Sequence, residues 1–299
     1  MFATAGIHPC SSQIFSSNSD EEGSELNHAC DPDPSKPIPE DDEPCLAKTE
    51  TIMSKLTALL ETARSAQFPD QRGLVAFGEF GLDYDRLHYC SKKIQLHSFT
   101  AQLKLAASLS PQLPLFLHSR AAHHDFVSLL KTTFGNRLER LESGGVVHSF
   151  TGTMEEMKEL TDLGLYIGVN GCSLKTAENC AVVGAIPLNR LMLETDGPWC
   201  EIRPSHEGSK YYFQDKQGDG VGTAGEQLGT KKKNQSVAHQ GRFKVVKKEK
   251  WVEGAMIKGR NEPCTIEKVA GVVAGIKGIP IEDVCNAAWG NTTRVYGLS

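Results

Sequence analysis

Five side chains that can bind a metal ion or transfer a proton each stand at the end of a short apolar run: His8, Glu79, His118, His148 and Asp196. Imidazole nitrogens and carboxylate oxygens form a mixed ligand set that zinc, manganese or magnesium can accept, and a carboxylate can bridge two ions. Taken singly, each residue has a plainer explanation, such as a rim ion pair for Glu79 or a turn cap for Asp196. Because such residues occur at the ends of five separate apolar runs, we favour the interpretation that they form one shared site.

The apolar runs before these residues predict short buried strands, and segments with helical spacing follow them. We expect strands at 3–8, 73–79, 113–117, 144–147, 165–169 and 191–193, and helices at 47–66, 91–109, 122–134, 154–163, 176–185, 265–276 and 281–295. Alternating strands and helices with functional groups at the carboxyl ends of the strands are typical of a (β/α) barrel. The sequence therefore predicts an α/β protein with a TIM (β/α) barrel fold and the five side chains at its mouth.

Two stretches interrupt this alternation. Residues 11–45 are rich in Ser, Asp, Glu and Pro, and residues 20–50 alone carry a net charge of -9 while the whole chain carries -5. Residues 213–246 are rich in Gly, Lys and Gln, and residues 209–250 carry a net charge of +6. Such compositions do not bury enough apolar surface to order a chain. We expect a single domain over residues 1–299 with disordered insertions at 11–45 and 213–246.

A metal site at the mouth of a barrel points to hydrolysis. A bound ion lowers the pKa of water and neutralises charge on a phosphoryl oxygen. Asp196, at the last clear strand, is the natural proton acceptor or second-metal ligand. We expect Asp83 and Arg86 at the rim, where Asp83 can support a metal-binding histidine.

Several segments also carry a family resemblance, in the order in which they occur. These are Gly-Ile-His-Pro at 6–9, Gly-Glu-Phe-Gly-Leu-Asp at 78–83, Phe-Leu-His-Ser-Arg at 116–120, Val-His-Ser-Phe-Thr-Gly at 147–152, Asn-Gly-Cys-Ser-Leu-Lys at 170–175, Glu-Thr-Asp-Gly-Pro-Trp at 194–199 and Arg-Asn-Glu-Pro at 260–263. Together they resemble the TatD family of metal-dependent deoxyribonucleases, and most closely a eukaryotic branch of it.

The resemblance implies a TIM barrel of the metal-dependent hydrolase superfamily that binds one or two divalent ions, Mg²⁺, Mn²⁺ or Zn²⁺. It implies Glu79, His118, His148 and Asp196 as metal ligands, with His8 near the scissile phosphate. Asp196, Glu79 and His8 are the expected catalytic residues. Family members carry about one strand-helix-strand unit ahead of the Gly-x-His-Pro motif, and this sequence starts past it. We therefore expect a barrel that is incomplete at its N-terminus.

The expected activity is hydrolysis of DNA phosphodiester bonds by a metal-activated water. Four basic residues are candidate phosphate contacts: Arg120, Lys175, Lys210 and Arg260. Two other interpretations stay open at this point. One keeps the metal but has an ester or amide as the substrate, for example an aminoacyl ester on RNA, because barrels host many reactions. The other is a non-catalytic remnant whose open barrel edges impair folding.

The composition of the sequence indicates the cellular compartment in which we expect the protein. The nine cysteines are scattered and include no Cys-x-x-Cys pair, which favours reduced thiols inside the cell over a disulfide framework. No apolar run reaches membrane-spanning length, and the first residues do not resemble a secretory signal. We expect a cytoplasmic or nuclear protein with DNA as its substrate, no membrane contact and no evident stable protein partner.

Overall fold

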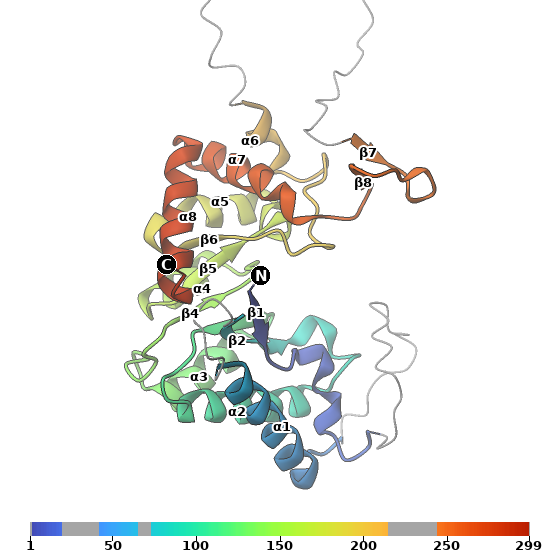
Figure 1. Cartoon of the computed structure of the whole chain (residues 1–299). Helices are drawn as coiled ribbons and strands as arrows, with labels where there is room; N and C mark the ends of the chain where they lie inside the picture. Colours follow the sequence, from blue (N-terminus) through green and yellow to red (C-terminus); the bar gives the residue numbers. More distant parts are fainter. Residues whose placement is uncertain (1, 20–41, 65–72, 215–243, 299) are drawn as a thin grey trace, which may run out of the picture.

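The main sheet of the computed structural model consists of six parallel strands and lies between the helices (Figure 1). The structure describes residues 2–19, 42–64, 73–214 and 244–298. The strands are β1 (Ala3–Ala5), β2 (Leu74–Asp83), β3 (Leu115–Arg120), β4 (Gly145–Val147), β5 (Tyr166–Val169) and β6 (Leu191–Leu193). Each strand pairs in parallel with the next one along the chain. This sequential order is the winding of a (β/α) barrel, as the sequence predicts.

Helices cover the sheet, and α1 to α5 of these connect its strands. They are α1 (Leu46–Arg64), α2 (Lys92–Ser108), α3 (His123–Phe134), α4 (Met154–Asp162), α5 (Ala177–Ala185), α7 (Ile266–Lys277) and α8 (Ile281–Tyr296). Helices α1 to α3 lie beside the first strands, whereas α5, α7 and α8 lie around β5 and β6 (Figure 1). The start of α2 is fixed by the expected cap, because Ser91 Oγ accepts a hydrogen bond from the Ile94 amide at 3.3 Å.

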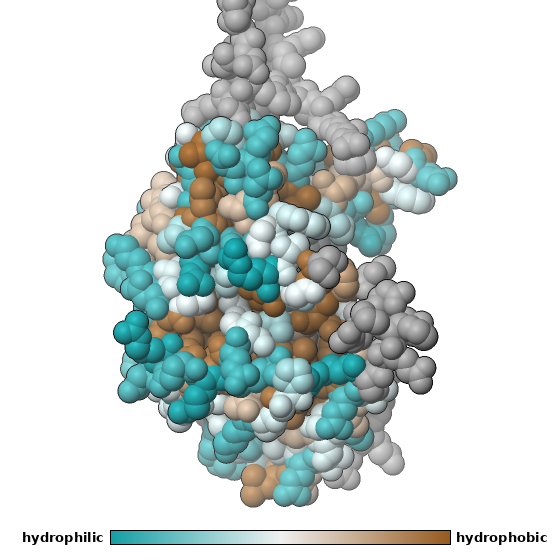
Figure 2. Space-filling view, turned by 60° about the vertical axis from the view of Figure 1, so that its left-hand side comes forward, coloured by the Kyte–Doolittle hydropathy of each residue, from teal (hydrophilic) through white to brown (hydrophobic). Residues whose placement is uncertain are grey.

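The hydrophobic core lies between the sheet and its helices. Phe77, Phe80 and Leu82 of β2 are fully buried. They pack in one cluster with Phe99 and Phe126, whose rings stack with centroids 5.3 Å apart. Burial of each side chain of this size stabilises the folded state by about 1.5–3 kcal/mol relative to leaving it exposed. The face in Figure 2 mixes hydrophilic and hydrophobic residues. Within the described ranges, no helix combines the length and apolarity needed to cross a bilayer.

The expected acidic insertion at 11–45 is ordered at both of its ends. Residues Pro9–Phe15 form a 3-10 helix, η1, and Ser16 bridges to Pro44. Between these ends lies the buried Asp42, whose carboxylate accepts hydrogen bonds from Ser16 and from Gln13 Nε2, the latter at 2.7 Å. These bonds satisfy a buried charge and hold the two ends of the insertion together. The remainder of the insertion, 20–41, lies outside the described residues.

The second expected insertion, 213–246, also begins and ends in ordered elements. Helix α6 (Ser209–Gln214) extends into its first residues, and its last residues form β7 (Lys244–Val246), which pairs in parallel with β8 (Ala255–Ile257). This pair projects from the barrel (Figure 1). The sequence does not predict β7, because its residues are mostly exposed and carry no apolar alternation. The intervening residues 215–243, with the lysine run at 231–233, lie outside the described residues.

Candidate metal centre

All three predicted histidines reach the site, each from a separate element. His8 lies three residues beyond β1 and caps η1, where its Nδ1 accepts a hydrogen bond from the Cys10 amide at 3.1 Å. His118 lies within β3, and His148 directly follows β4. Because β1 to β4 are neighbours in parallel register, their carboxyl-terminal parts lie at the same edge of the sheet. The sheet therefore brings these side chains together, as predicted.

Glu79 lies inside its strand and not at its end, which corrects the predicted boundary. Strand β2 continues to Asp83, with a register irregularity between Gly78 and Phe80. A Cβ added at Gly81, where φ is 155°, would lie only 1.9 Å from the carbonyl oxygen of His118. Glycine here allows the two strands to approach each other closely. The same glycines made the apolar run look shorter in the sequence than the strand is.

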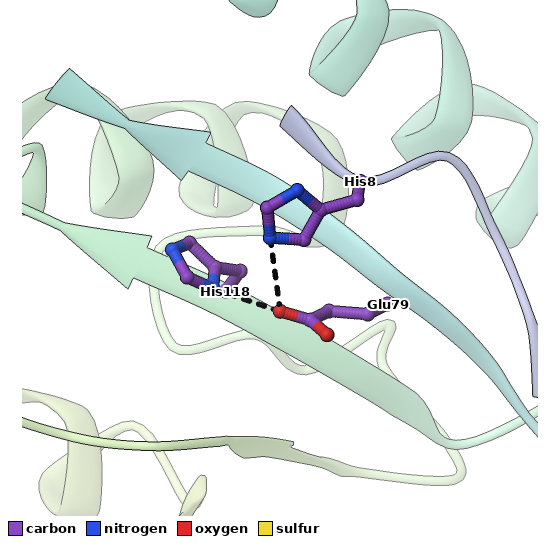
Figure 3. Close-up of side chains that lie close together, drawn as sticks. All are labelled: His8, Glu79 and His118. Atoms are coloured by element: carbon purple, nitrogen blue, oxygen red, sulfur yellow. Dashed lines mark hydrogen bonds and ion pairs between the residues drawn. The ribbon is translucent and has the colours of Figure 1, made fainter. Parts of the chain in front are cut away.

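One carboxylate oxygen, Oε1 of Glu79, is the common neighbour of all three histidines. It lies 3.3 Å from His8 Nε2, 2.8 Å from His118 Nδ1 and 2.5 Å from His148 Nε2. Figure 3 shows His8 and His118 converging on this oxygen from two different elements. The rings of His118 and His148 are almost fully buried, whereas the Glu79 side chain is 27% exposed. We refer to these four residues as the Glu79 cluster.

The charges of the cluster follow from these contacts. Burial alone would raise the pKa of Glu79, but hydrogen bonds from His118, His148 and His8 together hold that pKa well below its usual range. Burial alone would likewise lower the pKa of His148, but its bonds to Glu194 and Glu79 raise it to about 10. Without a bound ion, the structure therefore holds an ionised carboxylate against a protonated imidazole.

Two carboxylates stand behind the histidine rings. Asp83 is completely buried, and its Oδ2 lies 3.0 Å from His118 Nε2, which is the supporting contact expected from the sequence. The same oxygen lies 3.8 Å from both Arg86 and Arg120. On the other side, Glu194 Oε2 lies 3.3 Å from His148 Nδ1. Carboxylates in these positions fix the orientation and tautomer of a metal-binding imidazole.

Sequence reasoning missed the role of Glu194. It lies just after β6, and the backbone amide of Ser149 also donates to it at 3.3 Å. Space for its carboxylate comes from Gly168 in β5, because a Cβ at that position would lie 1.5 Å from Glu194 Oε1. The sequence did carry a signal, because Glu194 and Asp196 both follow the same short strand. Only Asp196 was interpreted as a functional carboxylate.

The structure places Asp196 beside the cluster. Asp196 lines the same cavity as the Glu79 cluster, and its Oδ2 accepts a hydrogen bond from Cys200 Sγ at 3.1 Å. Among the described residues, the group with ligand atoms mutually within 4.8 Å consists of His8, Glu79 and His118, and includes neither Asp196 nor His148, which joins the cluster through its contact with Glu79. His8, predicted next to the scissile phosphate, is thus positioned to be a ligand. The predicted ligand role of Asp196 remains a prediction.

The site opens into a cavity of about 680 Å³ at the carboxyl ends of the strands. Two of the predicted phosphate contacts, Arg120 and Lys175, line this cavity together with the cluster. A volume of this size is typical of a ligand site. A larger cavity of about 1140 Å³ lies at the amino ends, lined by residues such as Leu74, Gly144 and Arg190. It lacks the cluster, so we assign the chemistry to the smaller one.

The other two predicted phosphate contacts lie elsewhere. Arg260 lines a second cavity of about 720 Å³ with Lys248 and Trp251. Gly197 and Pro198, which directly follow Asp196, form part of the wall of that cavity, so it adjoins the mouth. Lys210, in contrast, forms a surface ion pair with Glu207 at 2.6 Å and does not line either cavity.

The donor set of the cluster fits a divalent ion. It combines imidazole nitrogens with an ionised carboxylate, it is largely buried, and Asp83 and Glu194 support two of its rings. Imidazole must be neutral to bind a metal, so binding would displace the proton held by His148. Such proton displacement is the ordinary behaviour of a histidine metal site.

Comparison with known proteins identifies the family of this chain. The sequence model of the TatD related DNases matches residues 1–297. The chain belongs to the TatD family. A TatD relative from Schizosaccharomyces pombe, named deoxyribonuclease Tat-D, is 42% identical over 98% of this chain and 74% of that protein. One of the same name from Saccharomyces cerevisiae is 34% identical over 99% of this chain and 74% of that protein. A crystal structure of an uncharacterized amidohydrolase from Saccharomyces cerevisiae superposes with a TM-score of 0.75 at 31% identity, covering 99% of this chain and 80% of that one.

Proposed function

We propose that this TatD-family chain is a deoxyribonuclease that hydrolyses DNA phosphodiester bonds with the help of one or two divalent ions. The observation that carries the proposal is the Glu79 cluster itself. One ionised carboxylate oxygen lies within 3.3 Å of three imidazole nitrogens, at the wall of a cavity that also holds Arg120 and Lys175. Metal donors and phosphate-binding cations thus face one space. The names of the relatives from the two yeasts, deoxyribonuclease Tat-D, support the same substrate.

His8, Glu79, His118 and His148 would hold the ion. When bound there, a divalent ion supplies a nucleophile at neutral pH and neutralises charge that develops on the phosphoryl group. Three imidazoles around one carboxylate favour Zn²⁺ or Mn²⁺ over Mg²⁺, which prefers oxygen ligands.

The remaining residues of the cavity have separate tasks. Arg120 and Lys175 bind and orient the phosphate, because guanidinium and ammonium groups are the usual protein donors to phosphate oxygens. Asp196, on the cavity wall, accepts the proton that leaves the attacking water. Asp83 and Glu194 hold the rings of His118 and His148 in place.

The decisive experiment replaces the central carboxylate without changing its size. Purified wild-type protein with Mn²⁺, Zn²⁺ or Mg²⁺ is expected to degrade end-labelled single-stranded DNA. Glu79→Gln removes the charge shared by the three histidines. Loss of a residue that supports a metal ligand typically lowers activity roughly 10–100-fold. Glu79→Gln is expected to lower the rate of cleavage by more than this. Bound metal, measured by plasma mass spectrometry after gel filtration, is expected to fall in parallel.

Glu155→Gln is the matched control, because Glu155 is exposed in the first turn of α4. It is expected to cleave DNA and bind metal like the wild type. Cleavage that survives Glu79→Gln would contradict the assignment of the cluster. Cleavage that is insensitive to salt would instead favour a small uncharged substrate, because DNA binding weakens steeply with salt.

A further inference from the structure

Two cysteines from different segments meet at the wall of the cavity. Cys172 lies in the 3-10 helix η4 (Gly171–Leu174) after β5, and Cys200 lies beyond β6. Their sulfur atoms are 2.8 Å apart, and both residues line the cavity beside Asp196. Both are partly exposed, so a small solute in the cavity reaches them.

The backbone holds the two thiols close together. A Cβ added at Gly171 would lie 1.9 Å from the carbonyl oxygen of Cys200, so the main chains of the two segments are in contact. The side chain of Asn170 accepts a hydrogen bond from the Cys172 amide at 2.8 Å and also donates to Ser149 Oγ at 2.9 Å, which anchors this segment to the loop after β4. A disulfide requires the sulfur atoms to approach by only about 0.8 Å from their present separation.

The other described cysteines lack this arrangement. Cys90 and Cys180 are buried, and burial raises the pKa of both, that of Cys180 to about 11. The pKa of Cys172 is instead lowered to about 6, first by its hydrogen bond with Cys200 and then by the nearby cations Lys175 and Arg120. Thiolate is the reactive form, so Cys172 is the expected attacking sulfur.

We propose that Cys172 and Cys200 form a reversible disulfide when the protein reacts with a hydroperoxide such as hydrogen peroxide. The Cys172 thiolate attacks one peroxide oxygen, the oxygen–oxygen bond breaks, and Cys172 becomes a sulfenic acid while hydroxide leaves. The Cys200 sulfur then attacks the Cys172 sulfur, the sulfur–oxygen bond breaks, and the Cys200 proton leaves with the departing hydroxide as water. The two thiols thus supply the two electrons that reduce the peroxide.

Disulfide formation changes the site as well as the cysteines. The single S–H of Cys200, which is shared between Cys172 and Asp196, is lost, so that carboxylate loses the partner at 3.1 Å. The bond also ties the segment after β5 to the segment after β6, on one wall of the cavity. We expect oxidation to lower DNA cleavage reversibly. This consequence rests on the proposed nuclease function, whereas the disulfide itself does not.

Peptide mapping tests the disulfide directly. Full-length protein is treated with a small excess of hydrogen peroxide, its remaining thiols are alkylated, and it is digested with trypsin. Cys172 is then the single cysteine of peptide 159–175, and Cys200 is the single cysteine of peptide 191–210, because trypsin does not cut before Pro204. The expected product is these two peptides joined, lighter by two hydrogen atoms and separated again by dithiothreitol. Cys172→Ser and Cys200→Ser are expected to abolish it.

Other oxidation products would overturn the inference. Cys10 also lines the cavity, so a peptide joining it to Cys172 would show that the pair has been wrongly assigned. Irreversible oxidation of Cys172 with both peptides left unjoined would do the same. The exposed Cys264 and Cys285 are expected to remain fully alkylated in the monomeric fraction and serve as internal controls.

An activity measurement separates this inference from the proposed function. The measured quantity is the ratio of DNA cleavage with and without peroxide, which does not depend on the basal rate of a variant. It is expected to fall in the wild type, to recover with dithiothreitol and to stay near one in Cys172→Ser. Joined peptides in a protein that never cleaves DNA would contradict the nuclease function alone. An active enzyme without joined peptides would contradict the disulfide alone.

Discussion

Oε1 of Glu79 is shared by His8, His118 and His148, so a change to one of these four side chains alters the surroundings of the other three. The residue types were predictable from the sequence because each follows an apolar run. Their convergence on one oxygen was not, because it depends on side-chain directions that only the packed sheet fixes. Two supporting carboxylates, Asp83 and Glu194, complete the arrangement.

Asp83→Asn tests the supporting contact behind His118. The substitution keeps the size of the side chain but removes the charge 3.0 Å from His118 Nε2. We expect the affinity for Mn²⁺, measured by isothermal titration calorimetry, to fall about 10–100-fold. Asp162→Asn, at an exposed position near the end of α4, is expected to bind Mn²⁺ like the wild type. Unchanged affinity in Asp83→Asn would show that His118 does not depend on this partner.

Metal binding is expected to release a proton and to strengthen as the pH rises. His148 has a pKa of about 10 without metal, so it is protonated at neutral pH, and the metal requires the neutral ring. Lowering the pH below that pKa therefore opposes binding, by about tenfold per pH unit for this proton alone. Titrations at pH 8 in two buffers of different ionisation enthalpy measure the number of protons released. A heat of binding that is independent of the buffer would contradict a protonated His148.

At the scale of elements, the sequence predicted the six strands and the covering helices well but misjudged two regions. It ended β2 at Glu79, because Gly78 and Gly81 normally mark boundaries, whereas here they let β2 approach β3. It also missed the pair of β7 and β8, because the exposed and charged residues of β7 give no apolar period. Both errors have the same cause, since long-range strand contacts determined the local structure against the local signal.

Gly168→Ala tests how β5 makes room for Glu194. The added methyl group would lie 1.5 Å from Glu194 Oε1, so the carboxylate must move away from His148. We expect metal affinity and DNA cleavage to fall about 10–100-fold, as for loss of a supporting carboxylate. Gly290→Ala in α8 is the matched control, because its Cβ would enter open space. It is expected to retain activity and to raise the free energy of unfolding by up to about 1 kcal/mol.

At the scale of the whole molecule, two adjoining cavities lie at the mouth of the barrel. The Glu79 cluster, Arg120 and Lys175 line the first, while Arg260 lines the second together with Lys248 and Trp251. Exposed cations and an aromatic ring next to a hydrolytic site are suited to the phosphates and bases of a single strand. We therefore expect a single strand bound at the cluster to continue into the second cavity.

Arg260→Ala tests that continuation. In the non-cleaving Glu79→Gln background, binding of a labelled oligonucleotide is measured at several salt concentrations. Loss of one phosphate contact is expected to reduce the slope of log Kd against log salt by about 1. Lys210→Ala is the control, because Lys210 pairs with Glu207 away from both cavities. Equal slopes for all three proteins would show that DNA does not reach Arg260.

Gly168 and Gly81 contribute no side chain to the site. An added methyl group would nevertheless collide with the carboxylate of Glu194 at Gly168, and with the backbone of His118 in β3 at Gly81. Tolerance to substitution at these two positions should therefore be lower than at glycines such as Gly290, whose Cβ would enter open space. Saturation mutagenesis of this enzyme is therefore expected to identify glycines around the active site as sensitive positions. A search limited to residues with reactive or metal-binding side chains would overlook them.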